Sequence, residues 1–225
     1  MKLENLRGLI VSIQPEPQSV LSEPHIVAEL AACAMANGAT GVRIESTQCI
    51  AAVRKRCPAT PLVGLIKRSS GGFAPYITPA LSDVKEVLDA GAGIVAFDAT
   101  PRARPDGSTV ADAVREIHGR DAIAFADCST LDDARAALDA GADVVSTTLC
   151  GYTDETRNVT LPALDLVARV KALGAPFAVC EGGIVTTEQV ARAFASGADA
   201  VVIGTALTNL DLRIRSFAQA ARARR

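Results

Sequence analysis

The stretch Ser196-Gly-Ala-Asp-Ala-Val-Val-Ile-Gly204 decides the fold, because versions of it recur along the chain. Each version joins the end of a helical pattern, a Gly-Ala pair and a short apolar run. Glycine there suits a helix that ends in a left-handed residue, and the run suits a buried parallel strand. The other versions are Asn37-Gly-Ala-Thr-Gly-Val-Arg-Ile-Glu45, Ala90-Gly-Ala-Gly-Ile-Val-Ala-Phe-Asp98 and Ala140-Gly-Ala-Asp-Val-Val-Ser-Thr-Thr148.

Four further apolar runs fill the gaps between these units and bring the predicted strands to eight: Gly8–Gln14, Pro61–Lys67, Ala122–Asp127 and Pro176–Glu181. Helical patterns lie between the strands, at residues 24–37, 46–56, 80–90, 108–119, 130–140, 161–173, 186–196 and 210–223. Strict alternation of strand and helix predicts a parallel sheet with right-handed crossovers. Eight units in 225 residues predict one α/β domain over residues 1–225, a closed (β/α)8 TIM barrel. An open, doubly wound sheet is the alternative, but nothing in the sequence indicates the reversal of strand order that it needs.

Composition excludes several classes of function. The net charge is −2, and no basic stripe suited to nucleic acid is present. No apolar run approaches the roughly 20 residues that span a bilayer, so no membrane partner is expected. The basic tail Ala220–Arg225 is interpreted as the cationic end of the last helix, rather than as an anchor for RNA or membrane.

The cysteines and the N-terminus indicate a cytoplasmic protein. Six cysteines without a CxxC spacing are typical of reduced, mostly buried thiols. The segment Met1–Arg7 carries charge where a secretory signal needs an apolar run. The sequence leaves the oligomeric state open, with a homodimer as one option.

Polar residues gather where the predicted strands end. In a barrel of this kind the C-terminal ends of the strands build the active site. Burying so many polar groups without a use would cost stability. The residues are Gln14, Arg43, Glu45, Lys67, Arg68, Asp98, Asp127, Thr147, Thr148, Glu181, Gly204 and Thr205.

Lys67 and Glu181 form the sharpest pair among them. They end the third and seventh strands, which lie on opposite sides of a barrel mouth. An amine and a carboxyl group that face a small substrate from two sides can remove a proton and return one from the other side. Desolvation and neighbouring charges can bring both pKa values towards neutrality. Arg43 and Asp127 are expected to set the charge of the lysine and to hold substrate hydroxyls, while a purely structural Lys–Glu ion pair is the alternative.

Glycines after the seventh and eighth strands predict a phosphate site. The segments are Gly182-Gly183 and Gly204-Thr205. Glycine lets backbone N–H groups approach an anion, and the loops after these two strands are the usual phosphate cradle of the fold.

No metal and no cofactor are expected. His25 and His118 fall in predicted helices, away from the strand ends, so a histidine-rich metal site is not indicated. Gly71-Gly72 lacks the GxGxxG pattern of a dinucleotide site and is interpreted as a loop. Cys128 and Cys180 lack an evident partner base, which favours packing over nucleophilic catalysis.

The ordered motifs resemble the N-acetylmannosamine-6-phosphate 2-epimerase family over residues 8–217. The similar segments are Gly8-Leu-Ile-Val-Ser-Ile-Gln-Pro15, Gly41-Val-Arg-Ile-Glu45, Val63-Gly-Leu-Ile-Lys-Arg68, Ile77-Thr-Pro79, Phe97-Asp-Ala-Thr100, Arg104-Pro-Asp-Gly107, Ala126-Asp-Cys-Ser129, Ser146-Thr-Thr-Leu-Cys-Gly-Tyr-Thr153, Cys180-Glu-Gly-Gly183 and Val202-Ile-Gly-Thr-Ala206. The resemblance implies a phosphate-binding barrel that interconverts N-acetylmannosamine 6-phosphate and N-acetylglucosamine 6-phosphate in amino-sugar and sialic acid use.

The resemblance also implies roles for single residues. The catalytic lysine and glutamate of the family match Lys67 and Glu181. Its substrate-contacting glutamine, arginine and aspartate match Gln14, Arg43 and Asp127.

Two departures from the family's pattern concern the identity of the substrate. Asn209 stands where the family usually carries an arginine, and Arg213, one helical turn later, is expected to replace it. The second departure is at Gly183, where the family often has a basic residue before Asn-[ST]-Pro.

The sequence therefore leaves three alternative functions for the protein. The first is a cofactor-independent 2-epimerase acting on a small phosphorylated sugar. The second is a Schiff-base lyase or aldolase that uses Lys67. The third is a non-catalytic sugar-phosphate-binding barrel. Borohydride trapping separates the first two, and turnover separates both from the third.

Overall fold

A closed ring of eight parallel strands forms the centre of the molecule. The computed structural model describes residues 2–222. The strands are β1 (Gly8–Ile13), β2 (Gly41–Glu45), β3 (Leu62–Leu65), β4 (Ile94–Asp98), β5 (Ile123–Asp127), β6 (Val144–Ser146), β7 (Ala178–Glu181) and β8 (Ala200–Ile203). Each pairs with the next, and β8 closes the ring by pairing in parallel with β1, from Gly8 opposite Ala200 to Val11 opposite Ile203. The predicted TIM barrel is therefore confirmed, and the open sheet is excluded.

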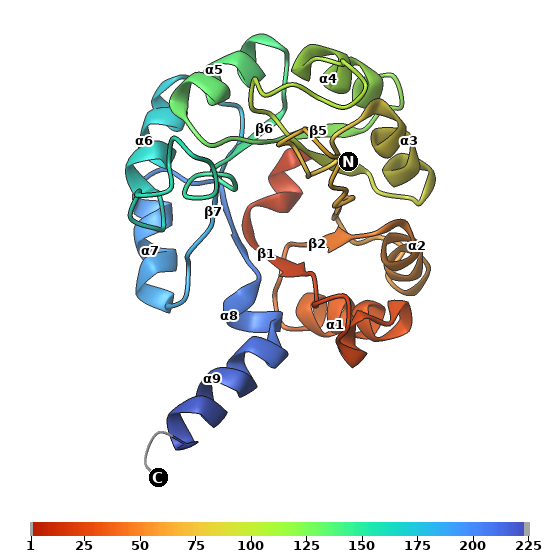
Figure 1. Ribbon diagram of the computed structural model, residues 1–225, viewed down its shortest axis with the longest axis vertical. Coiled ribbons are helices and arrows are strands. Elements are labelled where there is room, and N and C mark those ends of the chain that lie inside the picture. Colours follow the sequence, from red (N-terminus) through yellow and green to blue (C-terminus); the bar gives the residue numbers. More distant parts are fainter. Residues whose placement is uncertain (1, 223–225) are drawn as a thin grey trace.

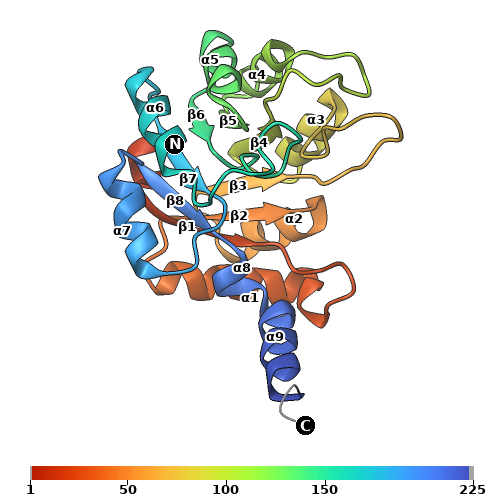
Figure 2. The same cartoon turned by 60° about the vertical axis from the view of Figure 1, so that its left-hand side comes forward.

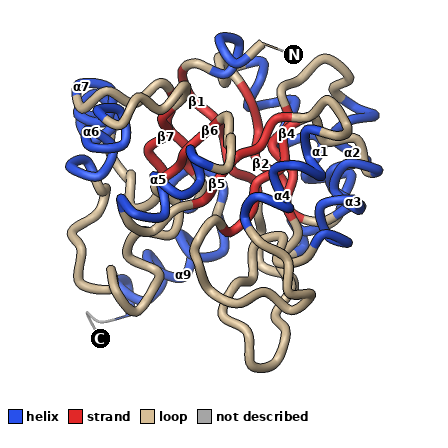
Figure 3. The backbone as a smooth tube through the Cα atoms, turned by 90° about the horizontal axis from the view of Figure 1, so that it is seen from above, coloured by secondary structure: helices blue, strands red, loops and turns tan. Residues whose placement is uncertain are grey.

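Helices surround this ring (Figure 1) and alternate with the strands along the chain. In the view from above, the strands lie at the centre and most helices lie outside them (Figure 3). The helices are α1 (Pro24–Ala36), α2 (Thr47–Arg56), α3 (Leu81–Asp89), α4 (Val110–His118), α5 (Leu131–Asp139), α6 (Leu164–Ala172), α7 (Thr187–Ala195), α8 (Thr205–Thr208) and α9 (Leu210–Arg222), with short 3-10 helices η1 (Leu3–Leu6) and η2 (Val20–Ser22).

The repeated Gly-Ala pair has the backbone that the sequence predicts. Gly38, Gly91, Gly141 and Gly197 have φ values of 95°, 101°, 91° and 96°. This is the left-handed region that glycine enters without strain. Each glycine therefore ends a helix and turns the chain back into the barrel at the start of the next strand.

Capping residues fix where several helices begin. Thr109, Thr130 and Thr186 accept hydrogen bonds from the backbone of the third residue of α4, α5 and α7. The predicted helix 161–173 instead begins at Leu164. Pro162 disfavours helical backbone at the residue before it, and the sequence prediction missed this delay.

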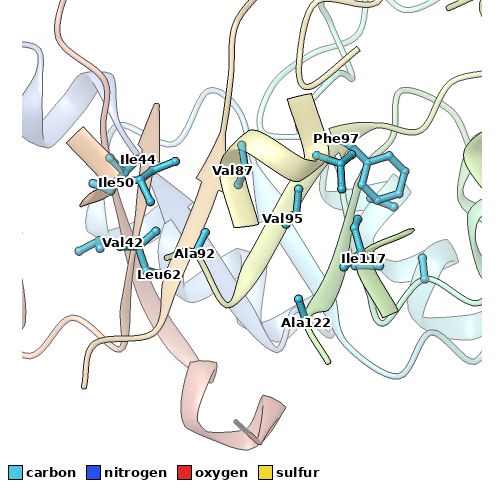
Figure 4. Close-up of a cluster of buried hydrophobic side chains, with 14 of the residues drawn as sticks. Val42, Ile44, Ile50, Leu62, Val87, Ala92, Val95, Phe97, Ile117 and Ala122 are labelled. Carbon is cyan, nitrogen blue, oxygen red and sulfur yellow. The ribbon is translucent and has the colours of Figure 1, made fainter. Parts of the chain in front are cut away.

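Alternate side chains of each strand face the helices or the barrel interior. Val42, Ile44, Val95 and Phe97 belong to the layer between strands and helices (Figure 4). Ile10, Val63, Phe125 and Val179 fill the interior. The same alternation turns Arg43 inward, between Val42 and Ile44, and places Asp127 and Glu181 at the inner ends of their strands.

Candidate active site

A cleft of about 480 Å³ opens at the C-terminal ends of the strands. Eight of the ten predicted site residues line it: Gln14, Arg43, Lys67, Glu181, Gly182, Gly183, Gly204 and Thr205. Asp127 lies fully buried beneath the lining and reaches it through Arg43 and Thr148. Arg213 is not among the lining residues.

Arg43 holds the floor of the cleft together. Its guanidinium is 1% exposed and makes a two-point contact with Asp127, with Nη1–Oδ1 3.1 Å and Nη2–Oδ2 2.7 Å. Nη1 also lies 3.3 Å from Oε2 of Glu181. Burial alone would lower the pKa of Arg43, but the two carboxyl groups outweigh it and raise the pKa. Arg43 is therefore a fixed positive charge that both carboxyl groups share.

Lys67 follows β3, where an isolated bridge to Ile77 fixes its backbone. Its side chain stands open to the cleft. The walls of the cleft still desolvate the ammonium group, and this desolvation together with the charge of Arg43 lowers the pKa of Lys67. A lysine with a lowered pKa is a better base near neutral pH than a free lysine.

Glu181 ends β7, four strands away from β3 in either direction around the closed ring. Its side chain is 14% exposed. Burial raises the pKa of Glu181, as does the charge of Asp127, while Arg43 opposes the rise. The cleft therefore combines an amine whose pKa is lowered with a carboxyl group whose pKa is raised, which are the shifts that acid–base chemistry needs.

The two glycine loops have free backbone donors and tight surroundings. Gly182 and Gly183 have φ values of 105° and 71°, and a Cβ on Gly183 would lie 2.4 Å from Cβ of Leu161. Their N–H groups make no hydrogen bond with another residue in the described part of the chain. Gly204 and Thr205, after the neighbouring strand β8, stand at the start of the short helix α8 and also line the cleft. The arrangement is able to present backbone N–H groups to an anion.

Asn209 and Arg213 lie at the junction of α8 and α9. Asn209 lines the cleft, and its Oδ1 accepts a hydrogen bond of 2.9 Å from the backbone N–H of Leu212. Arg213 donates from Nη1 to the carbonyl oxygen of Ala206 at 3.3 Å. The structure therefore does not bring Arg213 into the place that the sequence analysis assigned to it.

Thr148, Tyr76 and Tyr152 also line the cleft, and no role was predicted for them from the sequence. Thr148 was noted at a strand end, and its inward direction could have been inferred from its even spacing after Val144 and Ser146, which the strand alternation turns inward. Tyr76 and Tyr152 come from the loops after β3 and β6. No periodicity gives the direction of a loop side chain, so these two could not have been placed.

Asp98, Cys128 and Cys180 have structural roles. The Asp98 carboxylate accepts hydrogen bonds from Thr100 and Arg102 and is fully buried. Cys128 and Cys180 are buried, and burial raises the pKa of both thiols, that of Cys180 to about 11. Both are therefore thiols at neutral pH and not the thiolates that act as nucleophiles.

Within residues 2–222, no group of three or more His, Cys, Asp or Glu side chains is arranged to hold a metal ion. No helix in that range has the length and apolar character needed to cross a membrane.

Comparisons with known proteins agree on one family. Residues 27–223 match the family model described as "Putative N-acetylmannosamine-6-phosphate epimerase". Two proteins named "Putative N-acetylmannosamine-6-phosphate 2-epimerase" are similar to the chain. The one from Synechococcus elongatus is 41% identical over 219 residues, which are 96% of this chain and 94% of that protein. The one from Klebsiella pneumoniae is 44% identical over 204 residues, 91% of this chain and 85% of that protein.

A solved structure is similar over nearly the whole chain. It is the N-acetylmannosamine-6-phosphate 2-epimerase from Clostridium perfringens, which is 32% identical and superposes with a TM-score of 0.91. The match covers 97% of this chain and 95% of the other.

Proposed function

The chain belongs to the N-acetylmannosamine-6-phosphate epimerase family, and on that premise we propose that it interconverts N-acetyl-D-mannosamine 6-phosphate and N-acetyl-D-glucosamine 6-phosphate. The two sugars differ only in configuration at C2. The reaction therefore needs one proton removed from C2 and one returned to the opposite face.

One observation carries this proposal: Lys67 and Glu181 enter a single cleft from strands that lie four apart around the ring. When the sugar ring opens, the aldehyde at C1 acidifies the hydrogen on C2. In one direction Lys67 takes that proton, an enediol-like intermediate forms, and Glu181 supplies a proton to the other face. Lys67 gains one proton and Glu181 loses one, so the reverse direction starts from the product form of the enzyme.

Arg43, Asp127 and Gln14 orient the substrate in this proposal. Arg43 provides positive charge next to the carbon that becomes electron-rich, which stabilises the developing negative charge. Asp127 keeps Arg43 in place through its two-point contact. Gln14, whose Nε2 donates to Oγ of Ser12 at 2.7 Å, is held at the rim where it contacts a substrate hydroxyl.

The phosphate binds between the two glycine loops. Gly182 and Gly183 offer backbone N–H groups from one side, and Gly204 and Thr205 offer them from the other. This leaves the phosphate at the end of the cleft formed by β7 and β8, with C2 held between Lys67 and Glu181.

The protein acts as a homodimer in this proposal. Helix α9 extends away from the barrel in two views (Figures 1 and 2) and has no buried residue. Leu210, Ile214 and Phe217 follow one face of it and are 51%, 58% and 72% exposed. An apolar face of this kind suits a second copy of the chain. The six cysteines are free thiols, which supports a cytoplasmic location.

Proton NMR in D2O tests the function. Wild-type protein mixed with N-acetylmannosamine 6-phosphate is expected to give N-acetylglucosamine 6-phosphate that carries deuterium at C2. Cleavage of the sugar, with a lysine adduct trapped by borohydride, would instead support a Schiff-base lyase. Binding without turnover would support a sugar-phosphate-binding protein.

A further inference from the structure

The hydroxyl group of Thr148 lies within hydrogen-bond distance of three polar groups, but it has only one hydrogen to donate. Its Oγ1 lies 2.6 Å from Oδ1 of Asp127, 2.9 Å from Oε2 of Glu181 and 2.8 Å from Oγ of Ser146. A hydroxyl group has one hydrogen to donate and two lone pairs that accept. Thr148 can give a full hydrogen bond to only one of the three neighbours, so each of the other two forms a full hydrogen bond with it only by donating to it.

Ser146 can be one of the two donors. Its side chain is fully buried, and Thr148 is the partner of its hydroxyl within the described residues. Buried hydroxyl groups are rarely left without a partner. The second donor has to be a carboxyl group, and a carboxyl group donates only when it carries a proton. A complete set of hydrogen bonds around Thr148 therefore needs one proton on either Asp127 or Glu181.

Arg43 decides which of the two carries it. Asp127 accepts two hydrogen bonds from Arg43, whereas Glu181 has a single approach of 3.3 Å. The two-point contact favours the ionised form of Asp127 more strongly than the longer contact favours that of Glu181. In the arrangement that gives each of these hydroxyl and carboxyl groups a hydrogen bond, Ser146 and Glu181 donate to Thr148, and Thr148 donates to Asp127.

We propose that Thr148 is a positioning residue whose hydroxyl holds one proton on Glu181 in the resting enzyme. The inference rests on the proposed function, because it assigns roles within that reaction. In the first turnover of the resting enzyme, Lys67 is then the base, as the free amine, and removes the C2 proton. Glu181 is the acid that supplies a proton to the other face. When Glu181 has given up its proton, the Thr148 hydrogen can turn from Asp127 to the new carboxylate, so the same hydroxyl serves both protonation states.

The charged groups around the pair agree with a single proton when Lys67 is the free amine. Arg43 is then the one positive charge beside the two carboxyl groups, and ionisation of both would leave an uncompensated negative charge in a buried site. Burial raises the pKa of Glu181 and also that of Asp127. Four titratable or charged groups on neighbouring elements face the two carboxyl groups. They are Arg43 on β2, Lys67 and Tyr76 around the loop after β3, and Asp98 on β4.

Infrared spectroscopy of the substrate-free enzyme tests where the proton lies. A protonated carboxyl group has a carbonyl stretch that is separate from the bands of carboxylates. At neutral pH we expect this band in the wild type and its loss in Glu181→Gln. No such band in the wild type, or a band lost only in Asp127→Asn, would overturn the inference.

Variants of the hydroxyl residues test the role of Thr148. Thr148→Val removes the hydroxyl with little change of shape and is expected to remove the band from neutral pH. It should also lower kcat by about 10- to 100-fold, as expected for losing a hydrogen bond to a charged group, with little change in KM. Thr148→Ser should restore the band. Ser146→Ala is the matched control, because it leaves the Thr148 hydroxyl in place. This variant should keep the infrared band.

The outcomes separate this inference from the proposed function. A band that is unchanged in Thr148→Val would show that Thr148 does not hold the proton, even if the wild type epimerises its substrate. A band that behaves as expected in an enzyme that does not epimerise N-acetylmannosamine 6-phosphate would contradict the function and leave the proton on Glu181. The comparison of wild type with Glu181→Gln needs no Thr148 variant, so poor folding of Thr148→Val would not remove the test.

Discussion

At the scale of single residues, the charge of Arg43 sets the chemistry of its neighbours. Arg43 is nearly fully buried, and its guanidinium contacts both carboxyl groups of the cleft floor. It also lowers the pKa of Lys67. A single side chain thus links the group that is proposed to act as base with the group that is proposed to act as acid.

Arg43→Gln is expected to move the titration of Lys67 to higher pH. Removing a nearby positive charge makes the ammonium form of Lys67 more favourable, so its pKa rises. The measurement is the rate at which an amine-selective reagent labels Lys67 as a function of pH, because only the free amine reacts. The onset of labelling should shift upward in Arg43→Gln.

Arg43→Lys is the matched control for that measurement. It keeps the positive charge and loses the two-point contact with Asp127. Its labelling onset should stay near that of the wild type. An onset that does not move in Arg43→Gln would show that Arg43 does not control the charge of Lys67. Circular dichroism should accompany both variants, since breaking a buried ion pair costs about 3–5 kcal/mol.

At the scale of elements, the loops after β7 and β8 carry the proposed phosphate site. Gly182→Val and Gly204→Val should each raise KM for a phosphorylated substrate far more than they lower Tm. Gly182 has positive φ, and a Cβ on Gly204 would lie 3.2 Å from Cβ of Ser12, so both changes disturb the loops locally. Inhibition by inorganic phosphate should weaken in both variants. Equal inhibition of variant and wild type would place the phosphate elsewhere.

The junction of α8 and α9 gives a second prediction at this scale. Asn209 lines the cleft and Arg213 does not. Arg213 was expected from the sequence to fill the place of the family's arginine, but its guanidinium bonds to Ala206 instead. We therefore expect Asn209→Arg to lower KM for N-acetylmannosamine 6-phosphate more than Arg213→Ala raises it. An increase of about 10-fold in Arg213→Ala, the scale of one lost hydrogen bond to a charged group, would restore Arg213 as a ligand.

Much of this architecture follows from periodicity in the sequence. The Gly-Ala repeat predicts the strands and the direction of the chain, and alternation along each strand predicts that Arg43, Asp127 and Glu181 face inward. Periodicity ends where the strands end. The side chain of Arg213 on α9 and those of Tyr76 and Tyr152 in loops are placed by tertiary contacts, which no local pattern records. The start of α6 was predicted too early for a different reason, because the local signal of Pro162 was not used.

At the scale of the whole molecule, the proposed homodimer can be tested at α9. Phe217→Asp places a charge on the exposed apolar face that also includes Leu210 and Ile214. If this face meets a second copy, the variant should sediment as a monomer under conditions in which the wild type sediments as a dimer. Glu16→Gln is a useful control. Glu16 lies outside α9 and forms an ion pair with Arg215 of α9, but it is not part of the apolar face. A wild type that is monomeric at micromolar concentration would contradict the assembly.

We propose that the barrel as a whole brings Lys67 and Glu181 to opposite faces of one substrate. The most direct test is the exchange of the C2 hydrogen for deuterium in Lys67→Ala and Glu181→Gln, started from each epimer separately. Each variant should lose at least about 10²-fold in kcat for epimerisation, the usual scale for a positioned acid or base. Each should still exchange the hydrogen of one epimer. Glu181→Gln should act on the epimer whose C2 hydrogen faces Lys67, and Lys67→Ala should act on the other through the ionised form of Glu181. Exchange of the same epimer by both variants, or epimerisation at a rate close to that of the wild type in either, would contradict the account.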